Sequence, residues 1–180
     1  MDEAGRGALF GPVVAAAVIL ERGRDVSLYR DSKTLSEAQR ERLFETLQAD
    51  GHAWAAAEVS AEEIDRTNIL RASLRAMAIA VSRLPVPPQF VLIDGPVPPE
   101  LPFPLEAVVH GDALSASIAA ASIVAKVRRD GLMRNLDKVY PGYGLAKHKG
   151  YGTESHLEAL RRLGPTPLHR RSFKGVEGVF

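Results

Sequence analysis

The sequence predicts an α/β fold, with a basic and largely helical C-terminal region. Two observations indicate this class. Short apolar runs alternate along the chain with longer amphipathic stretches, as in folds whose helices cover a sheet. The length of 180 residues is that of a single domain. The content of 46% hydrophobic and 25% charged residues is typical of a globular protein.

The elements of the first half can be predicted in order. Residues 12–20 are apolar and β-branched, which predicts a buried strand. Ser36 has a glutamine three residues further on, a capping-box pattern, so we expect a helix to begin after it. Residues 52–59 predict a second strand. Ser60 begins a second capping-box pattern, and the helix that follows is expected to continue, with a break, to about Leu84.

The second half begins with two compact apolar runs, 90–94 and 105–110, which predict strands. Residues 113–135 follow a helical pattern, with alanine and serine on one side. The chain becomes rich in glycine and lysine after Pro141, which predicts a loop. A last helix is expected over 154–163, because a glycine follows it in a C-cap position.

The charge distribution divides the chain. The net charge is only +1, but residues 126–174 contain 12 Lys/Arg and 4 Asp/Glu, whereas the remainder contains 11 and 18. An acidic part beside a basic part suits a protein that holds metal ions and binds a polyanion; a solvated basic surface is the alternative. We expect one catalytic domain over residues 1–180, whose basic portion, about 136–180, binds substrate.

Several function classes are excluded by what the sequence lacks. The absence of cysteine excludes disulfides and thiolate chemistry and fits a reducing compartment, so we expect a cytoplasmic protein. No apolar run approaches the roughly 18 residues that a membrane helix needs. The sequence contains no GxxxxGK[ST], HExxH or GxSxG pattern, which argues against a P-loop nucleotidase, a zinc protease and a serine hydrolase.

Four acidic residues lie at the ends of strand-like apolar runs, close to glycines. They are Asp2, Glu3, Asp94 and Asp112. One such residue is usually a turn former or a cap, but four together predict a shared site. Carboxylate oxygens are the ligands that Mg²⁺ and Mn²⁺ prefer. The set therefore predicts a two-metal site of the kind that hydrolyses phosphodiesters.

The first acidic pair is followed by Gly5, Arg6 and Gly7. Two glycines allow backbone N–H groups to approach a ligand closely, and the arginine supplies a fork for phosphate. A tight turn is the alternative for such a short pattern. Its position directly after the carboxylates favours a phosphate-binding role.

Longer motifs follow one another in order from residue 2 to about 174. They are DEAGRG (2–7), GPVVAAAVIL (11–20), DSKTLS (31–36), LIDG (92–95), HGDA (110–113), AASIVAKVRRD (120–130), YPGYGLAKHKGYGT (140–153) and HRRSF (169–173). Together they resemble bacterial ribonuclease HII. The resemblance implies an RNase H-like fold, which is a mixed five-stranded sheet flanked by helices. It also implies an enzyme that uses Mg²⁺ or Mn²⁺ to hydrolyse the RNA strand of RNA–DNA hybrids and to cut duplex DNA 5′ of a single embedded ribonucleotide, leaving 3′-hydroxyl and 5′-phosphate ends.

The resemblance also implies roles for individual residues. Asp2, Glu3, Asp94 and Asp112 become the metal-binding catalytic set, and Gly5, Arg6 and Gly7 contact the ribonucleotide 2′-hydroxyl and the neighbouring phosphate. Tyr151 becomes the residue that senses the RNA–DNA junction. The candidate phosphate contacts are Ser32, Lys33, Lys126, Lys147 and Lys149, with Arg129, Arg170 and Arg171 as weaker candidates. Asp130 fits an ion-paired structural residue better than a catalytic one.

The chain departs from the family at its start, because members normally carry apolar residues before DEAG, and only Met1 stands there. We expect added upstream apolar residues to increase stability and metal affinity. Two alternatives remain open. One is another RNase H-fold nuclease, such as a junction resolvase or ribonuclease HIII. The other is a catalytically weak module that only binds hybrids. We expect a monomer.

Overall fold

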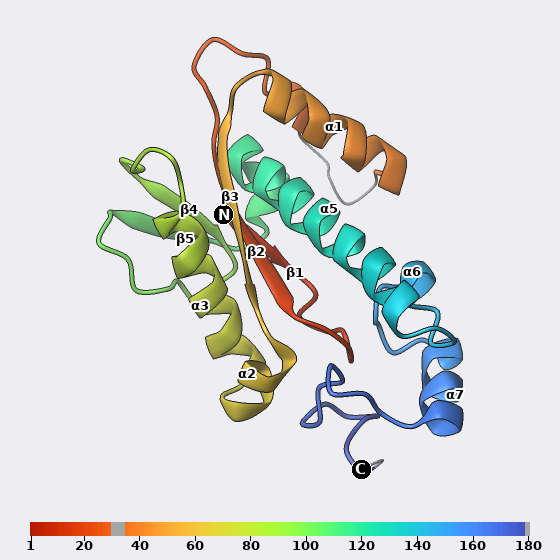
Figure 1. Ribbon diagram of the computed structural model, residues 1–180. Coiled ribbons are helices and arrows are strands. Elements are labelled where there is room, and N and C mark those ends of the chain that lie inside the picture. The colour runs from red at the N-terminus through yellow and green to blue at the C-terminus, as the bar shows by residue number, and fades with distance from the viewer. Residues whose placement is uncertain (30–34, 179–180) are drawn as a thin grey trace.

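The computed structural model describes residues 1–29 and 35–178, and its sheet carries helices on both faces (Figure 1). Ser32 and Lys33, two of the candidate phosphate contacts, lie outside the described residues. Strands β1 (Asp2–Ala4), β2 (Val13–Ile19) and β3 (Ala53–Val59) form an antiparallel unit in the order β1-β2-β3. Strands β4 (Val91–Asp94) and β5 (Leu105–Val108) pair in parallel.

Met1 joins these two units into one sheet. Its α-amino group donates to the carbonyl of Leu92 at 2.6 Å, and its carbonyl accepts from the amide of Asp94 at 3.1 Å. This is the pattern of a parallel pair, so β1 lies beside β4. The hydrogen bonds therefore run through all five strands in the order β3-β2-β1-β4-β5. The predicted mixed five-stranded sheet is confirmed.

Alternate residues of the strands face different helices, because successive side chains of a strand point to opposite faces. On one face, Val13 and Ala15 pack with Met77 of α3 (Ile69–Ser82). On the other face, Ala16 packs with Ile123 of α5 (Ala116–Val139). The buried alanines of α5 allow this helix to lie close to β1 and β2. Helix α1 (Glu37–Ala49) packs against α5 in turn (Figure 1).

The capping patterns locate the helices well. The Ser36 side chain accepts from the amide of Gln39, whose side chain accepts from the Ser36 amide, so the predicted capping box is present at the start of α1. Ser60 caps α2 (Ala61–Arg66) by accepting from the amide of Glu63. The expected break before α3 occurs at residues 67–68.

Two expectations for the second half need correction. The helix expected over 113–135 is two helices, α4 (Gly111–Leu114) and α5, separated at Ser115. Ser115 has an extended backbone, and it lets the chain turn from the end of the sheet onto its face. The loop expected after Pro141 contains a one-turn helix, α6 (Leu145–His148). Helix α7 (Glu154–Leu163) has the predicted bounds.

The C-terminal part of the chain packs against the segment that follows the first strand. Isolated bridges pair Ala8 with Tyr151 and Phe10 with His169. Phe10 is fully buried in a cluster with residues of α5, α6 and α7. This contact brings the glycine- and lysine-rich segment of the chain next to β1.

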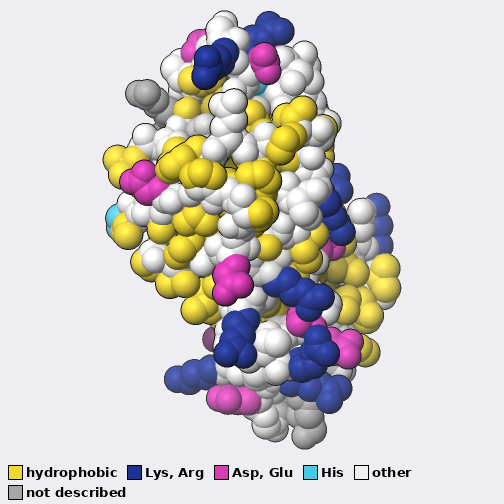
Figure 2. Space-filling model, turned by 90° about the vertical axis from the view of Figure 1, so that its left-hand side faces the viewer, with side chains coloured by type: hydrophobic (Ala, Val, Ile, Leu, Met, Phe, Trp, Pro, Cys, Tyr) yellow, Lys and Arg dark blue, Asp and Glu magenta, His cyan; other side chains and the backbone are white. Residues whose placement is uncertain are grey.

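The surface on the β4–β5 side of the molecule is divided by residue type. Hydrophobic side chains gather over its middle, most of the Lys and Arg side chains in view lie below them, and a few charged side chains lie at the top (Figure 2). Exposed hydrophobic residues of the chain include Phe90, Val97 and Val109, in segments that flank β4 and β5. Within residues 1–29 and 35–178, no helix is both long and apolar enough to cross a membrane.

Candidate active site

The sheet brings three of the four predicted carboxylates to the same end. Asp2 and Glu3 lie on β1, and Asp94 is the last residue of the neighbouring strand β4. The bond between the Asp94 amide and the Met1 carbonyl aligns the two strands, so Asp94 lies beside the acidic pair. Asp2 is buried and Glu3 is partly buried. The like charges of Asp94, Asp2 and Glu3 interact with one another.

The fourth carboxylate reaches this end through a tight turn. The amide of Gly111 donates to Oδ1 of Asp94 at 2.7 Å. A Cβ atom at position 111 would lie 2.5 Å from Cδ1 of Ile118 and 3.4 Å from Oδ1 of Asp94, so the glycine lets the turn pass close to both side chains. Asp112, the next residue, is buried in the first turn of α4. The turn therefore holds Asp112 next to Gly111, which is hydrogen-bonded to Asp94.

The electrostatics of the site show an excess of negative charge. Burial, followed by the charge of Glu3, raises the pKa of Asp2 to about 7, although a hydrogen bond from Ser122 opposes the shift. Burial also raises the pKa of Glu3, against the effect of Arg6, whose guanidinium binds Glu3 Oε1 at 3.1 Å. Burial lowers the pKa of the Met1 α-amino group to about 6. The amino group therefore carries little positive charge at pH 7.

The donor chemistry of this site fits a hard cation, because every candidate ligand is a carboxylate oxygen. A cation would also relieve the repulsion among these carboxylates, which adds to the effect of burial in raising the pKa values of Asp2 and Glu3. Within the described part of the chain, however, no three acidic or histidine side chains are close enough to hold a metal ion as they stand. One oxygen of Asp2 accepts from the Glu3 amide at 2.7 Å, and one of Asp94 accepts from Gly111.

A pocket of about 420 Å³ opens on the other side of Glu3. Its lining residues come from β1, the glycine-rich turn, α1, α5 and the segment before α7. They are Glu3, Ala4, Gly5, Arg6, Gly7, Arg40, Ser122, Lys126 and Tyr151. Glu3 also lines a second hollow, which contains Asp94. Glu3 and Arg6 thus lie between the carboxylates and the predicted junction-sensing tyrosine.

Two arginines hold the glycine-rich turn in place. Arg129 and Arg170 are fully buried, with 0% exposure. Arg129 donates to the carbonyls of Pro12, Phe10 and Lys149 at 3.2, 3.1 and 2.8 Å. It also lies 5.5 Å from the centre of the Tyr151 ring. One guanidinium therefore connects the turn and the tyrosine.

Arg170 supports the same turn from the C-terminal tail. It donates to the carbonyls of Arg6 and Gly11, both at 2.9 Å. Burial, and next the charge of Arg129, lowers the pKa of Arg170 to about 9. The structure thus places Arg129 and Arg170 beneath the turn as supports, and exposes Arg171 at the surface.

The three lysines that were predicted to contact phosphates, and that the structure describes, occupy different environments. Lys126 lines the pocket and lies 5.8 Å from the centre of the Tyr151 ring, and Lys147 is exposed on α6. Lys149 is 9% exposed, and its Nζ donates to the carbonyl of Ala146 and to Glu37 at 2.6 and 3.2 Å. Of these three, Lys126 is placed best for a ligand in the pocket.

A chain of histidines fixes the backbone of Tyr151. The amide of Thr166 donates to Nδ1 of His169, so the proton of this neutral ring is on Nε2. That proton is donated to Nε2 of His156, 3.3 Å away, and Nδ1 of His156 donates to the carbonyl of Tyr151 at 2.9 Å. Burial lowers the pKa of both rings, that of His169 to about 4. Both histidines are therefore neutral at pH 7.

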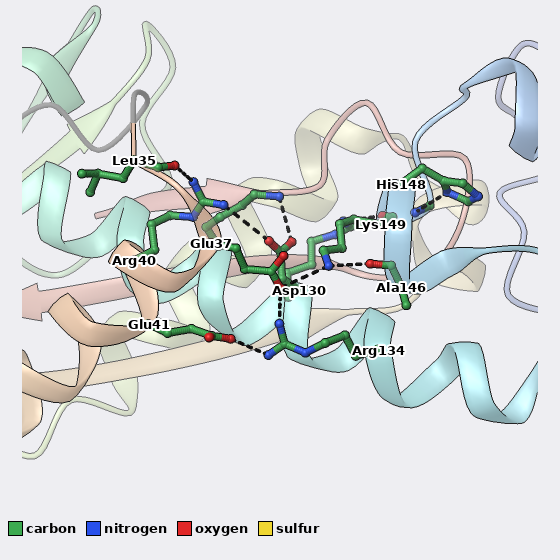
Figure 3. Close-up of polar contacts among 12 residues, drawn as sticks. Leu35, Glu37, Arg40, Glu41, Asp130, Arg134, Ala146, His148 and Lys149 are labelled. Atoms are coloured by element: carbon green, nitrogen blue, oxygen red, sulfur yellow. Dashed lines mark hydrogen bonds and ion pairs between the residues drawn. The ribbon is translucent and has the colours of Figure 1, made fainter.

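Arg40 is a pocket residue that the sequence motifs did not single out. It lies on α1, outside the motif formed by residues 31–36, and the helical pattern alone gives it the appearance of an ordinary surface residue. Its partner in the structure is Asp130 on α5 (Figure 3). Asp130 also pairs with Lys126, which agrees with the ion-paired role predicted for it.

Comparison with known proteins gives consistent results. A family model described as Ribonuclease HII matches residues 1–176. Ribonuclease HII from Geobacter sulfurreducens is 52% identical over 176 residues, which cover 98% of this chain and 81% of that protein. Ribonuclease HII from Desulfitobacterium hafniense is 53% identical over 177 residues, covering 98% and 68%.

Solved structures share the fold. Ribonuclease H2 from Pyrococcus horikoshii superposes with a TM-score of 0.79 at 29% identity, covering 99% of this chain and 94% of that one. The RNase HII of a PCNA complex from Archaeoglobus fulgidus gives 0.79 at 26% identity, covering 98% and 94%. Bst-RNase HIII, solved with Mn²⁺, gives 0.78 at 18% identity, covering 99% and 67%, which shows a common fold.

Proposed function

Because the chain belongs to the bacterial ribonuclease HII family, whose members are ribonucleases H, we propose that it is a metal-dependent endoribonuclease with two related substrates. It hydrolyses the RNA strand of RNA–DNA hybrids, and it cuts duplex DNA on the 5′ side of a single embedded ribonucleotide. The products carry 3′-hydroxyl and 5′-phosphate ends. The observation that carries this proposal is the position of Glu3, which lines both the hollow of Asp94 and the pocket of Tyr151.

The carboxylate end of the sheet is the proposed catalytic part. Asp2, Glu3, Asp94 and Asp112 would hold Mg²⁺ or Mn²⁺ as their ligands. A pair of such ions supplies an activated water and stabilisation of the leaving oxygen. The raised pKa values of Asp2 and Glu3, which come first from burial, support this assignment, because buried carboxylates that lie close together are stabilised by a bound positive charge.

The pocket is proposed to recognise the ribonucleotide and the sugar that follows it. The backbone of Gly5, Arg6 and Gly7 borders it, and such N–H groups and carbonyls can bind a 2′-hydroxyl, which both donates and accepts. The ring of Tyr151 lies on the same pocket, where it would pack against the sugar of the next nucleotide and exclude a second 2′-hydroxyl. The basic portion over residues 136–180 would contact phosphates, which position a duplex without reading its sequence.

Cleavage of an end-labelled DNA duplex that contains one ribonucleotide tests the proposal. We expect one cut, 5′ of the ribonucleotide, with Mg²⁺ or Mn²⁺ and none with EDTA. An all-DNA duplex of the same sequence is the control and should stay intact. Tight, salt-sensitive binding without cleavage in either metal would instead support a module that only binds hybrids.

A further inference from the structure

The pocket beside Glu3 contains a cation that the resemblance does not assign. We propose that Arg40 binds a phosphate of the nucleic-acid strand in this pocket, beside Lys126, and that Asp130 positions both cations. This inference rests on the proposed function, because it specifies how that same site holds its substrate. Arg40 would be a binding residue, whereas Asp130 would act through its two partners.

The carboxylate of Asp130 reaches both cations from the interior. Its side chain is 3% exposed, and it projects from α5 toward α1 (Figure 3). Oδ1 accepts from Nζ of Lys126 at 2.8 Å, and Oδ2 lies 3.9 Å from Nη2 of Arg40. The Arg40 Nη1 donates to the carbonyl of Leu35. The guanidinium of Arg40 is thereby held at two points.

The charges at the pocket favour a phosphate. One buried carboxylate faces two cations, so this group of three has a net charge of +1 on the pocket wall. Arg6 and Glu3 also line the pocket, but they pair with each other at 3.1 Å and so leave this net charge unchanged. A guanidinium that is already oriented loses less side-chain entropy when a phosphate binds than a freely rotating surface arginine does. Its planar fork also matches two phosphate oxygens.

The shape of the pocket indicates a strand of nucleic acid rather than a small anion. One wall is the backbone of the glycine-rich turn and another is the ring of Tyr151, with Lys126 5.8 Å from the ring centre. An aromatic ring beside a line of cations suits a sugar–phosphate chain. Glu3 and Arg6 line both this pocket and the hollow of Asp94, so the pocket adjoins the carboxylates that would act on the same strand.

A second set of ion pairs makes the wall around Arg40 rigid. Glu37 binds Arg134 and Lys149, and Glu41 binds Arg134 at 2.7 Å (Figure 3). These pairs connect α1 to α5 and to the segment that follows α6. Because Arg40 lies between the two glutamates on α1, its position relative to Lys126 is set by packed helices.

The salt dependence of binding tests the role of Arg40 without any catalytic step. Affinity for a fluorescent DNA duplex with one ribonucleotide is measured by anisotropy in EDTA over a range of salt. The slope of the logarithm of the binding constant against the logarithm of the salt concentration becomes smaller in magnitude by roughly one unit when one phosphate contact is lost. We expect that loss for Arg40→Gln, together with about tenfold weaker binding, and a retained slope for Arg40→Lys.

Arg42→Gln is the matched control. Arg42 is exposed on the same helix, and because it follows Arg40 by two residues it lies on a different face. Its slope should change less than that of Arg40→Gln. An Arg40→Gln variant with the affinity and slope of the wild type would overturn the proposal. If the wild-type protein binds this duplex but does not cut it in Mg²⁺ or Mn²⁺, the proposed function fails while the slope still decides the role of Arg40.

Asp130→Asn separates positioning from charge. The substitution makes the pocket more positive, so a purely electrostatic role predicts tighter binding and unchanged turnover. A positioning role predicts a kcat about tenfold lower with Kd equal or lower. Wild-type kcat in a folded variant would contradict positioning.

If Asp130→Asn does not fold, a double-mutant cycle of Arg40→Gln and Lys126→Gln replaces it. A shared carboxylate predicts that the two effects on binding are not additive. Strict additivity would contradict the shared positioning.

Discussion

The guanidinium of Arg129 occupies the space that any side chain at position 5 would need. A Cβ atom on Gly5 would lie 1.9 Å from Nε of Arg129, and the backbone of Gly5 has a φ of +91°. The same guanidinium also donates to the main-chain carbonyls of Phe10, Pro12 and Lys149. The glycine is therefore needed for two reasons, its conformation and the close approach of Arg129.

Gly5→Ala should lower stability by about 3 kcal/mol or more, because the strain of positive φ adds to a forced shift of Arg129. Gly23→Ala is the matched control. Gly23 also has a positive φ, +83°, but nothing lies within 4 Å of its added Cβ. We expect that control to cost about 1 kcal/mol. Urea denaturation of both variants measures the difference, and equal losses would contradict the steric role of Arg129.

Asp94→Asn should keep the fold and reduce cleavage by at least about a thousandfold, since it removes one ligand charge between the two strands. The Gly111 amide can still donate to the remaining side-chain oxygen. Glu158→Gln, at an exposed position of α7, is the control and should cleave like the wild type. Single-turnover cleavage with saturating Mn²⁺ gives the comparison. A folded, active Asp94→Asn variant would remove Asp94 from the catalytic set.

Asp2→Asn should stabilise the metal-free protein at neutral and alkaline pH. The folded-state pKa of Asp2, about 7, lies above its unfolded value of 3.8. The folded state therefore holds a proton that the unfolded state has released, and wild-type stability falls as pH rises from about 4 to 7. The variant does not show this fall in the free energy of unfolding, which is about 1.4 kcal/mol per pH unit at most. Thermal melts in EDTA at pH 5 and pH 8 should show a gap that widens with pH.

For the histidines behind Tyr151 we expect the opposite dependence of stability on pH. The pKa of His169 is lowered from 6.5 to about 4, so the unfolded state takes up a proton first on acidification. The contribution of His169 is complete above pH 6.5 and is lost as pH falls toward 4. Between pH 4.5 and 6.5, wild-type stability should rise with pH more steeply than that of His169→Gln, by on the order of 1 kcal/mol per unit. Parallel curves would show that His169 is protonated in the folded protein.

Tyr151→Ala should weaken the choice of cleavage position more than it weakens binding. The ring would exclude a 2′-hydroxyl after the cut site, whereas most of the affinity comes from phosphates. Cleavage of a duplex with four consecutive ribonucleotides should change from one main cut to several, and Kd should change less than about fivefold. Tyr140→Ala is a useful comparison, because Tyr140 lies at the end of α5 and packs on Phe10. An unchanged cut pattern for Tyr151→Ala would contradict junction sensing.

Local sequence signals were enough for most of the secondary structure. Capping side chains determined where α1 and α2 begin, and the glycine at position 164 determined where α7 ends. Such signals act over three or four residues, so they can be recognised without the fold. The two corrections to the predicted helices concern α4 and α6. Each of these helices is a single turn, whose formation depends on what it packs against.

The sequence by itself determined the α/β class, the family resemblance and the four carboxylates as candidates, because each depends on a local pattern or a motif. Only the tertiary structure decided which cations face the pocket and which support it from below. The bond from Arg170 to the carbonyl of Arg6 joins residues 164 positions apart. The pairing of Arg40 with Asp130 joins two helices that only the sheet brings together. No local periodicity distinguishes a buried arginine that binds carbonyls from an exposed one, since the difference arises when distant segments exclude water around it.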